Sequence, residues 1–185
     1  MMRITLADIQ PALSRAEKGV SQYAALMSRF PGVDVSADAD FQRQYNAFYR
    51  VQRRQEIWYR NYYELMQKLR KEKPVFSQVL DDIHRLCGRY EPSFASKLVA
   101  TIDPSKPVWD RHVLANTGNK APSYSSKCKY ERAKTVYVSI ENWYSKFFES
   151  IEGRLCISEF NRVFPDHEKF TDLKKIDFVL WQIRG

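Results

Sequence analysis

Two residues in the middle of the chain could carry out nucleophilic chemistry together. Lys97 lies in the short apolar segment 94–100, and Asp110 directly precedes the next predicted helix. The connection between them contains Pro104 and Pro107, and it could turn the chain back so that the amine and the carboxylate face a common cleft. An amine beside a carboxylate is the pairing that amine-based attack on a carbon centre needs.

Each of these residues also has an ordinary structural interpretation. A lysine on a helix is usually solvated, and an aspartate before a helix usually caps it, because its carboxylate accepts from free backbone N–H groups. Partial burial would favour the neutral amine of Lys97, whereas a nearby carboxylate would favour the ammonium form. The chemistry therefore depends on the helices that surround the two side chains.

Those surrounding elements are predicted to be helical along nearly the whole chain. Apolar residues recur at steps of three and four, and no stretch alternates convincingly with a period of two. We therefore expect an all-α fold, with a single helical domain over residues 1–185 in two lobes and a cleft between the lobes. The longest helix is predicted over residues 41–71, and a last helix is predicted to be capped by Thr171.

A helical hairpin is predicted immediately before Lys97. The helix from Phe76 ends near Gly88, where a residue without Cβ can adopt the left-handed conformation that closes a helix. A tight connection follows over residues 89–92, and Ser93 is the predicted N-cap of the helix that carries Lys97. The resulting unit is helix, short hairpin, helix.

Basic side chains gather on one side of the predicted helix 41–71, opposite its apolar face. A solvated charged surface is the ordinary interpretation of such a pattern. The excess of arginine also fits a stripe that faces phosphates. The residues of this stripe are Arg43, Arg50, Arg53, Arg54, Arg60 and Lys68.

Composition and charge further restrict the possible partners and location of the protein. The 185 residues carry 30 Lys and Arg against 22 Asp and Glu, a net charge of +8 that favours polyanionic partners. No apolar run reaches signal-peptide or membrane-spanning length, so we expect a cytoplasmic protein, nucleoid-associated in a prokaryote, with no membrane partner. Cys87, Cys128 and Cys156 are far apart, which predicts buried free thiols and no metal site. We expect no cofactor and no obligate protein partner.

The order of elements over residues 76–118 resembles the helix-hairpin-helix DNA glycosylase superfamily, especially its 8-oxoguanine DNA glycosylase-like branch. In that family the hairpin is followed by a helix with a catalytic lysine, and an aspartate begins a later helix as Val-Asp-x-His-Val or a near relative. Residues 94–100, Phe-Ala-Ser-Lys-Leu-Val-Ala, match the lysine helix, and residues 108–113, Val-Trp-Asp-Arg-His-Val, match the aspartate motif. The Leu-Pro-Gly-Val-Gly signature of the hairpin is replaced by Leu-Cys-Gly-Arg-Tyr-Glu-Pro at residues 86–92.

The resemblance implies base-excision repair of double-stranded DNA, with the damaged nucleotide flipped into a pocket. Lys97 would attack the sugar C1′ to form a Schiff base, Asp110 would assist, and strand cleavage by an AP lyase step could follow. Phosphates would be held by the hairpin around Gly88 and Arg89 and by the start of the Asp110 helix.

The resemblance also implies roles for the residues beside Asp110. Arg111 and His112 are candidate DNA contacts, although His112 could also simply pack. Trp109 could line the base pocket or belong to the core. Two alternatives to an enzyme remain, namely a catalytically inactive helix-hairpin-helix nucleic-acid-binding protein and a helical protein-interaction module.

Overall fold

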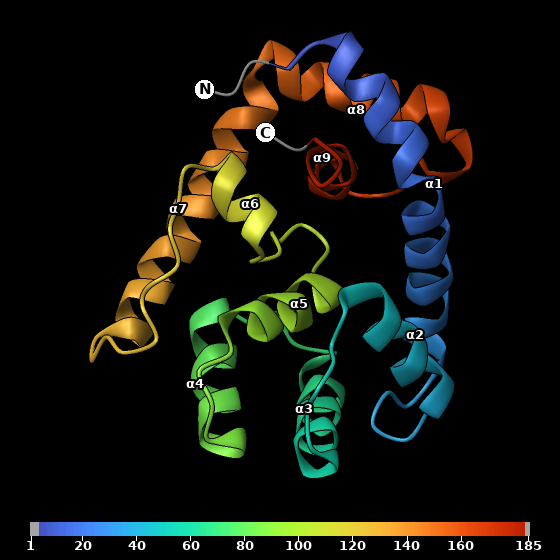
Figure 1. Cartoon of the computed structure of the whole chain (residues 1–185). Helices are drawn as coiled ribbons and strands as arrows, with labels where there is room; N and C mark the ends of the chain where they lie inside the picture. The colour runs from blue at the N-terminus through green and yellow to red at the C-terminus, as the bar shows by residue number, and fades with distance from the viewer. Residues whose placement is uncertain (1–3, 184–185) are drawn as a thin grey trace. The chain divides into compact units, whose positions relative to one another are not determined.

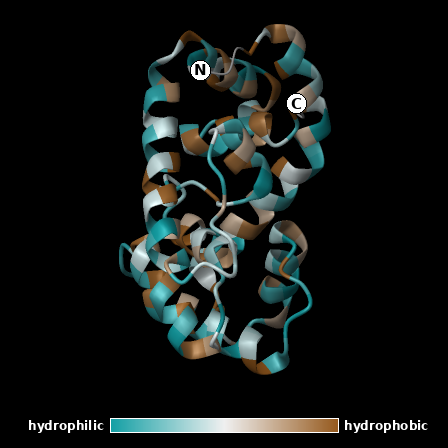
Figure 2. Ribbon diagram, turned by 60° about the vertical axis from the view of Figure 1, so that its left-hand side comes forward, coloured by the Kyte–Doolittle hydropathy of each residue, from teal (hydrophilic) through white to brown (hydrophobic). Residues whose placement is uncertain are grey.

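The computed structural model describes residues 4–183, and these residues form helices without a β-strand (Figure 1). The predicted all-α class is confirmed. Hydrophobic and hydrophilic residues are interspersed along the helices (Figure 2), as expected where one face of each helix is buried. Within residues 4–183, no helix has the combination of length and apolar character that crossing a bilayer requires.

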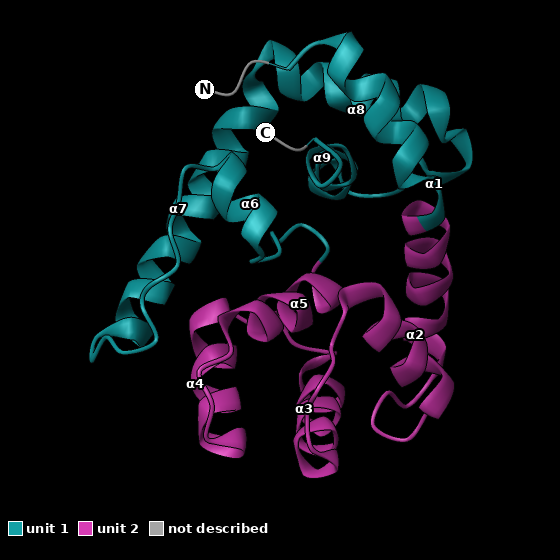
Figure 3. Ribbon diagram, in the orientation of Figure 1, with its two compact units in different colours: residues 1–18, 104–185 teal, residues 19–103 magenta. Residues whose placement is uncertain are grey.

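The chain divides into two compact units (Figure 3). Unit 2 takes in residues 19–103, and unit 1 takes in the chain before and after it. Helix α1 (Leu6–Arg29) runs through the first boundary. Unit 2 continues with η1 (Phe30–Gly32), α2 (Ala39–Tyr49), α3 (Glu56–Leu69), α4 (Phe76–Cys87) and α5 (Pro92–Ile102). Unit 1 continues with α6 (Arg111–Asn116), α7 (Lys129–Glu149), α8 (Ile151–Val163), η2 (Pro165–His167) and α9 (Asp172–Leu180).

Aromatic side chains build the core of unit 2. The hydroxyls of Tyr45 and Tyr62 lie 2.7 Å apart, and the Tyr62 hydroxyl donates to the Phe94 carbonyl oxygen at 2.9 Å. The Trp58 ring stacks on Tyr62 with 4.8 Å between centroids. Burial raises the pKa of both tyrosines well above its ordinary value, so the hydroxyls stay protonated. This core joins α2 and α3 to the helix that carries Lys97.

The prediction of one helix over residues 41–71 is wrong, because α2 and α3 are separate. Residues 52–56 are all polar, so they offer no side chain to continue the buried face. Arg50 and Arg53 have positive φ angles of 53° and 59°, a left-handed conformation that costs a non-glycine residue on the order of 1 kcal/mol or more. The arginine stripe is therefore not one face of one helix but is spread over two helices and a loop.

The connection between α4 and α5 agrees with the sequence-based prediction at Gly88 and differs from it at Ser93. Gly88 has φ 64° and ψ 17°, and its N–H donates to the His84 carbonyl oxygen at 2.8 Å. The predicted left-handed closure is thus confirmed. The prediction of Ser93 as N-cap is wrong, because α5 begins at Pro92, with Glu91 as its N-cap residue. Proline suits this first position because its φ is already helical and it has no N–H to leave unpaired.

In unit 1 the turn between α7 and α8 is very short. Ser150 is the only residue between the two helices, and its hydroxyl donates to the Phe147 carbonyl oxygen at 2.7 Å. The Ser150 hydroxyl oxygen in turn accepts from the Gly153 N–H at 3.0 Å. One serine therefore ends α7 and caps α8.

Helix α9 is capped by Thr171, whose hydroxyl accepts from the Lys174 N–H at 3.3 Å, as predicted. The helix also buries two charged residues. Lys174 and Asp177 are each 1% exposed, and the ammonium lies 3.2 Å from the carboxylate. The hydroxyl of Tyr144, on α7, donates to the other carboxylate oxygen. Unit 1 therefore has an ion pair at its centre.

Candidate functional site

Lys97 is one of the most enclosed lysines of unit 2. It lies in the middle of α5, and the residue is only 9% exposed. Its ammonium nitrogen lies 5.0 Å from the centroid of the Phe94 ring, within the range of a cation–π contact. The interpretation of Lys97 as a solvated surface residue is therefore wrong. Burial at this level is rare for lysine in proteins.

Asp110 caps the helix that follows it. Its Oδ1 accepts from the backbone N–H groups of His112 and Val113, both at 2.8 Å, which confirms the N-cap interpretation. Both bonds use the same oxygen, and the residue is half-buried. A carboxylate held in this way has a fixed orientation and also the favourable charge for a helix N-terminus.

The residues around Asp110 differ in exposure. Trp109 is buried, with 4% of the residue exposed, in keeping with a core position. Arg111 is exposed and His112 is half-buried. The Arg111 Nε donates to the His112 Nε2 at 3.3 Å, so the imidazole is engaged with its neighbour.

The predicted site residues fall into both units. Gly88, Arg89 and Lys97 belong to unit 2, whereas Asp110 and its three neighbours belong to unit 1. The shared cleft and the pairing of Lys97 with Asp110 thus stay predictions. Within unit 2, Arg89 is exposed, and it follows the left-handed glycine that ends α4.

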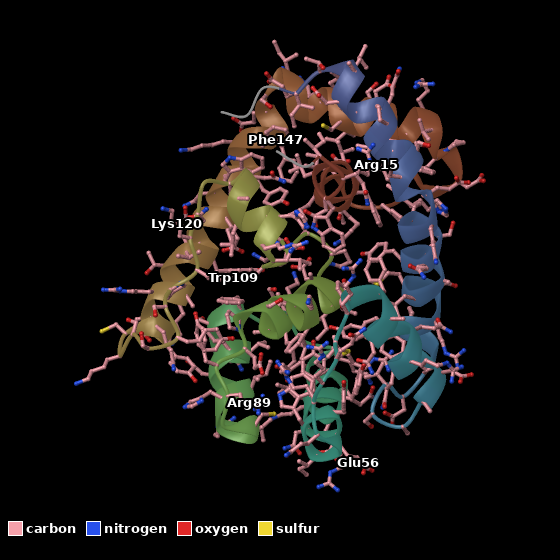
Figure 4. All side chains as sticks on the ribbon, viewed as in Figure 1. Arg15, Glu56, Arg89, Trp109, Lys120 and Phe147 are labelled. Carbon is pink, nitrogen blue, oxygen red and sulfur yellow. The ribbon has the colours of Figure 1, made fainter. Side chains whose placement is uncertain are left out.

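Arg89 also lines a pocket of about 140 Å³ that the sequence did not predict. The pocket is formed by the loop before α3, the first turns of α3 and the end of α4. Figure 4 labels Arg89 and also Glu56, the first residue of α3. The lining residues are Arg53, Arg54, Gln55, Ile57, Trp58, Asn61, Leu86, Cys87 and Arg89.

Arg54 ties this pocket to the hairpin. Its guanidinium lies 2.8 Å from the Glu91 carboxylate, and both side chains are largely buried. The same guanidinium lies over the rings of Trp58 and Phe94, at 5.7 and 4.9 Å from their centroids. The run of five polar residues over 52–56 was the available signal, because it interrupts the apolar periodicity where the pocket forms.

The cysteines are free, as predicted. Only Cys156 is fully buried, and Cys128 is exposed, which corrects the expectation of three buried thiols. Burial, and then the charge of Glu91, raise the pKa of the Cys87 thiol above its ordinary value. Cys87 therefore contributes a protonated thiol to the pocket rather than a reactive thiolate. Residues 4–183 contain no cluster of three His, Cys, Asp or Glu side chains that could hold a metal ion.

Comparison with protein-family models, curated proteins and solved structures finds no match to this chain. The resemblance to helix-hairpin-helix glycosylases therefore rests on the residues of segment 76–118 themselves.

Proposed function

We propose that the protein is a DNA base-excision repair glycosylase with AP lyase activity, in which Lys97 is the nucleophile. The observation that carries the proposal is the burial of Lys97 in α5, directly after a helical hairpin. A buried amine is more easily deprotonated than a solvated one, and a neutral amine is what attack on carbon requires. The net charge of +8 supports a nucleic-acid partner.

The proposed reaction begins with a flipped nucleotide. The Lys97 amine forms a bond to C1′ while the glycosidic bond breaks, and the base leaves with the bonding electrons and accepts a proton. The amine gives up a proton and the sugar ring opens, which leaves a protonated Schiff base. Loss of a C2′ proton then expels the 3′ phosphate and cleaves the strand. The carboxylate of Asp110 is assigned the stabilisation of positive charge on the sugar.

Borohydride trapping tests the nucleophile. Duplex DNA with an abasic site or with 8-oxoguanine is incubated with the protein and sodium borohydride, which reduces the Schiff base to a stable secondary amine. We expect the wild-type protein to form a covalent complex and Lys97→Gln to form none, because the glutamine amide cannot form an imine. Lys71→Gln, at an exposed position just after α3, is the matched control and should trap as the wild type does.

Two outcomes would contradict the proposal. The first is equal trapping by Lys97→Gln of unchanged thermal midpoint, which would assign the reactive amine to another lysine. The second is no trapping by the wild type with either DNA. If the protein then still bound DNA in a salt-sensitive way, the inactive nucleic-acid-binding alternative would stand in its place.

The charge of Asp110 can be tested without loss of its cap. Asparagine is as good an N-cap as aspartate, so Asp110→Asn should keep α6 while it removes the carboxylate. We expect trapping to slow by about 100-fold, the lower end of what a positioned acid–base group contributes. Single-turnover rates and thermal midpoints are measured together. Wild-type rates in Asp110→Asn would remove Asp110 from the proposed site.

A further inference from the structure

The pocket beside the hairpin has a strongly positive lining. It is lined by Arg53, Arg54 and Arg89 and by no carboxylate. Arg54 is paired with Glu91, whereas Arg53 and Arg89 have exposed side chains with no ion pair within residues 4–183. Three arginines and one carboxylate leave two net positive charges. Guanidinium groups bind phosphate oxygens through paired N–H donors.

Further hydrogen-bond donors lie in the same wall. Helix α3 is 14 residues long and begins at the pocket with Gln55 as N-cap residue, whose side chain does not cap it. Its first backbone N–H groups therefore add partial positive charge there. Trp58 forms part of the wall as well, and its buried indole N–H has no acceptor in the described part of the chain.

The backbone of the loop before α3 supports a role for Arg53 beyond folding. Arg50 and Arg53 both have left-handed conformations, which glycine would adopt without strain. Only Arg53 lines the pocket. Strained residues of this kind gather at ligand sites, where a side chain must be placed at a given point. Substitution of Arg53 therefore tests ligand binding, and the same substitution of Arg50 is its control.

We propose that this pocket binds a phosphomonoester, a terminal phosphate with its attached sugar. A phosphate ester of this class carries about −1.5 to −2 charges at neutral pH, which matches the two unbalanced arginines. The pocket, at about 140 Å³, is below the roughly 300–1,000 Å³ of pockets that enclose a whole drug-sized ligand. It thus fits the phosphate alone. The exposed side chains of Ile57 and Leu86, 46% and 44% exposed, lie at the same pocket and would contact the sugar.

The phosphate could belong to the end of a DNA strand or to a small molecule, and this site does not rest on the glycosylase chemistry. The test uses four probes at constant ionic strength: a short oligodeoxynucleotide with a 5′-phosphate, the same strand with a 5′-hydroxyl, ribose 5-phosphate and inorganic phosphate. Affinities are measured by calorimetry. We expect the wild-type protein to prefer the 5′-phosphorylated strand over the hydroxyl strand by at least about tenfold, the effect of one charge-assisted contact.

Two glycine variants separate ligand binding from folding. Arg53→Gly should abolish the preference for the phosphorylated strand, yet its thermal midpoint should equal or exceed that of the wild type, because the strain is relieved. Arg50→Gly should relieve strain in the same way and keep the preference. Binding of ribose 5-phosphate as tight as that of the strand would support a small-molecule source, and binding of the strand alone would support a DNA end.

Equal affinity for the phosphorylated and hydroxyl strands, without binding of ribose 5-phosphate or inorganic phosphate, would overturn the proposal. An undiminished preference in Arg53→Gly would overturn it too. Borohydride trapping through Lys97 is a separate assay, so failure of either proposal can be told from failure of the other.

Discussion

Replacing Lys174 by methionine is expected to lower the free energy of unfolding by about 3–5 kcal/mol, the cost of leaving one member of a buried ion pair without its partner. Methionine has a similar length, so the change removes the charge and leaves little cavity. The carboxylate of Asp177 would remain buried, at 1% exposure, with the Tyr144 hydroxyl still donating to it. Denaturant unfolding followed by circular dichroism measures the loss.

The loss should also depend on pH. Burial raises the pKa of the Asp177 carboxyl, while the Lys174 charge and the Tyr144 hydroxyl act to lower it. Without Lys174 the folded-state pKa rises further above the unfolded value of about 3.9. The protonated carboxyl then stabilises the fold at low pH, and this stability is lost as the pH rises through the folded-state pKa. We expect a larger deficit at about pH 8 than at about pH 5.

Two variants serve as controls for this ion pair. Lys106→Met changes a lysine of unit 1 that pairs with Glu141 at 2.8 Å while 40% of its own side chain is exposed, so we expect a loss below about 1 kcal/mol. The double variant Lys174→Met with Asp177→Asn should recover much of the stability, because no charge is left buried. A double variant no more stable than Lys174→Met alone would show that the lysine stabilises unit 1 by packing instead.

Gly153→Ala is expected to destabilise unit 1 by about 3 kcal/mol, the upper end of the usual cost of inserting a methyl group into a packed site. A Cβ at this position would lie 1.9 Å from the Phe147 carbonyl oxygen and 2.8 Å from its carbonyl carbon. Both atoms belong to the backbone, so no rotamer change can make room. The turn at Ser150 would have to open, and its two hydrogen bonds would weaken with it.

Gly32→Ala is the matched control, since a Cβ there would meet no atom within 4 Å. We expect its free energy of unfolding to stay within about 0.5 kcal/mol of the wild type. Urea unfolding curves of the two variants measure both free energies of unfolding. If Gly153→Ala were as stable as Gly32→Ala, the close approach of α8 to the end of α7 would not be a feature of the protein in solution.

The sequence predicted the helical class and the left-handed end of α4 well because both depend on local patterns. The apolar spacing of three and four residues identifies helices, and Gly88 marks the end of α4 by its conformational freedom. The capping residues Asp110 and Thr171 were predicted for the same reason, because each acts on backbone groups two or three residues away. Residues close together in the sequence are therefore sufficient to predict helix ends of this kind.

The pocket and the burial of Lys97 depend on contacts between distant segments, and the sequence did not predict them. The loop over residues 50–55 contains neither glycine nor proline. The residue types that usually end a helix were therefore missing where α2 ends. Arg54 appeared to belong to an exposed stripe, yet its partner Glu91 lies 37 positions away. Lys97 appeared solvated when considered alone, yet it is only 9% exposed and its ammonium lies 5.0 Å from the centroid of the Phe94 ring.

The stacked pair of Trp58 and Tyr62 has an optical consequence. The chain has four tryptophans, and Trp58 is the one that belongs to residues 19–103. A variant with phenylalanine at positions 109, 143 and 181 would emit indole fluorescence from unit 2 alone. Far-ultraviolet circular dichroism of the same sample would follow all helices together. Divergence of the two signals during unfolding would then reveal whether the two units melt as one cooperative body or in succession.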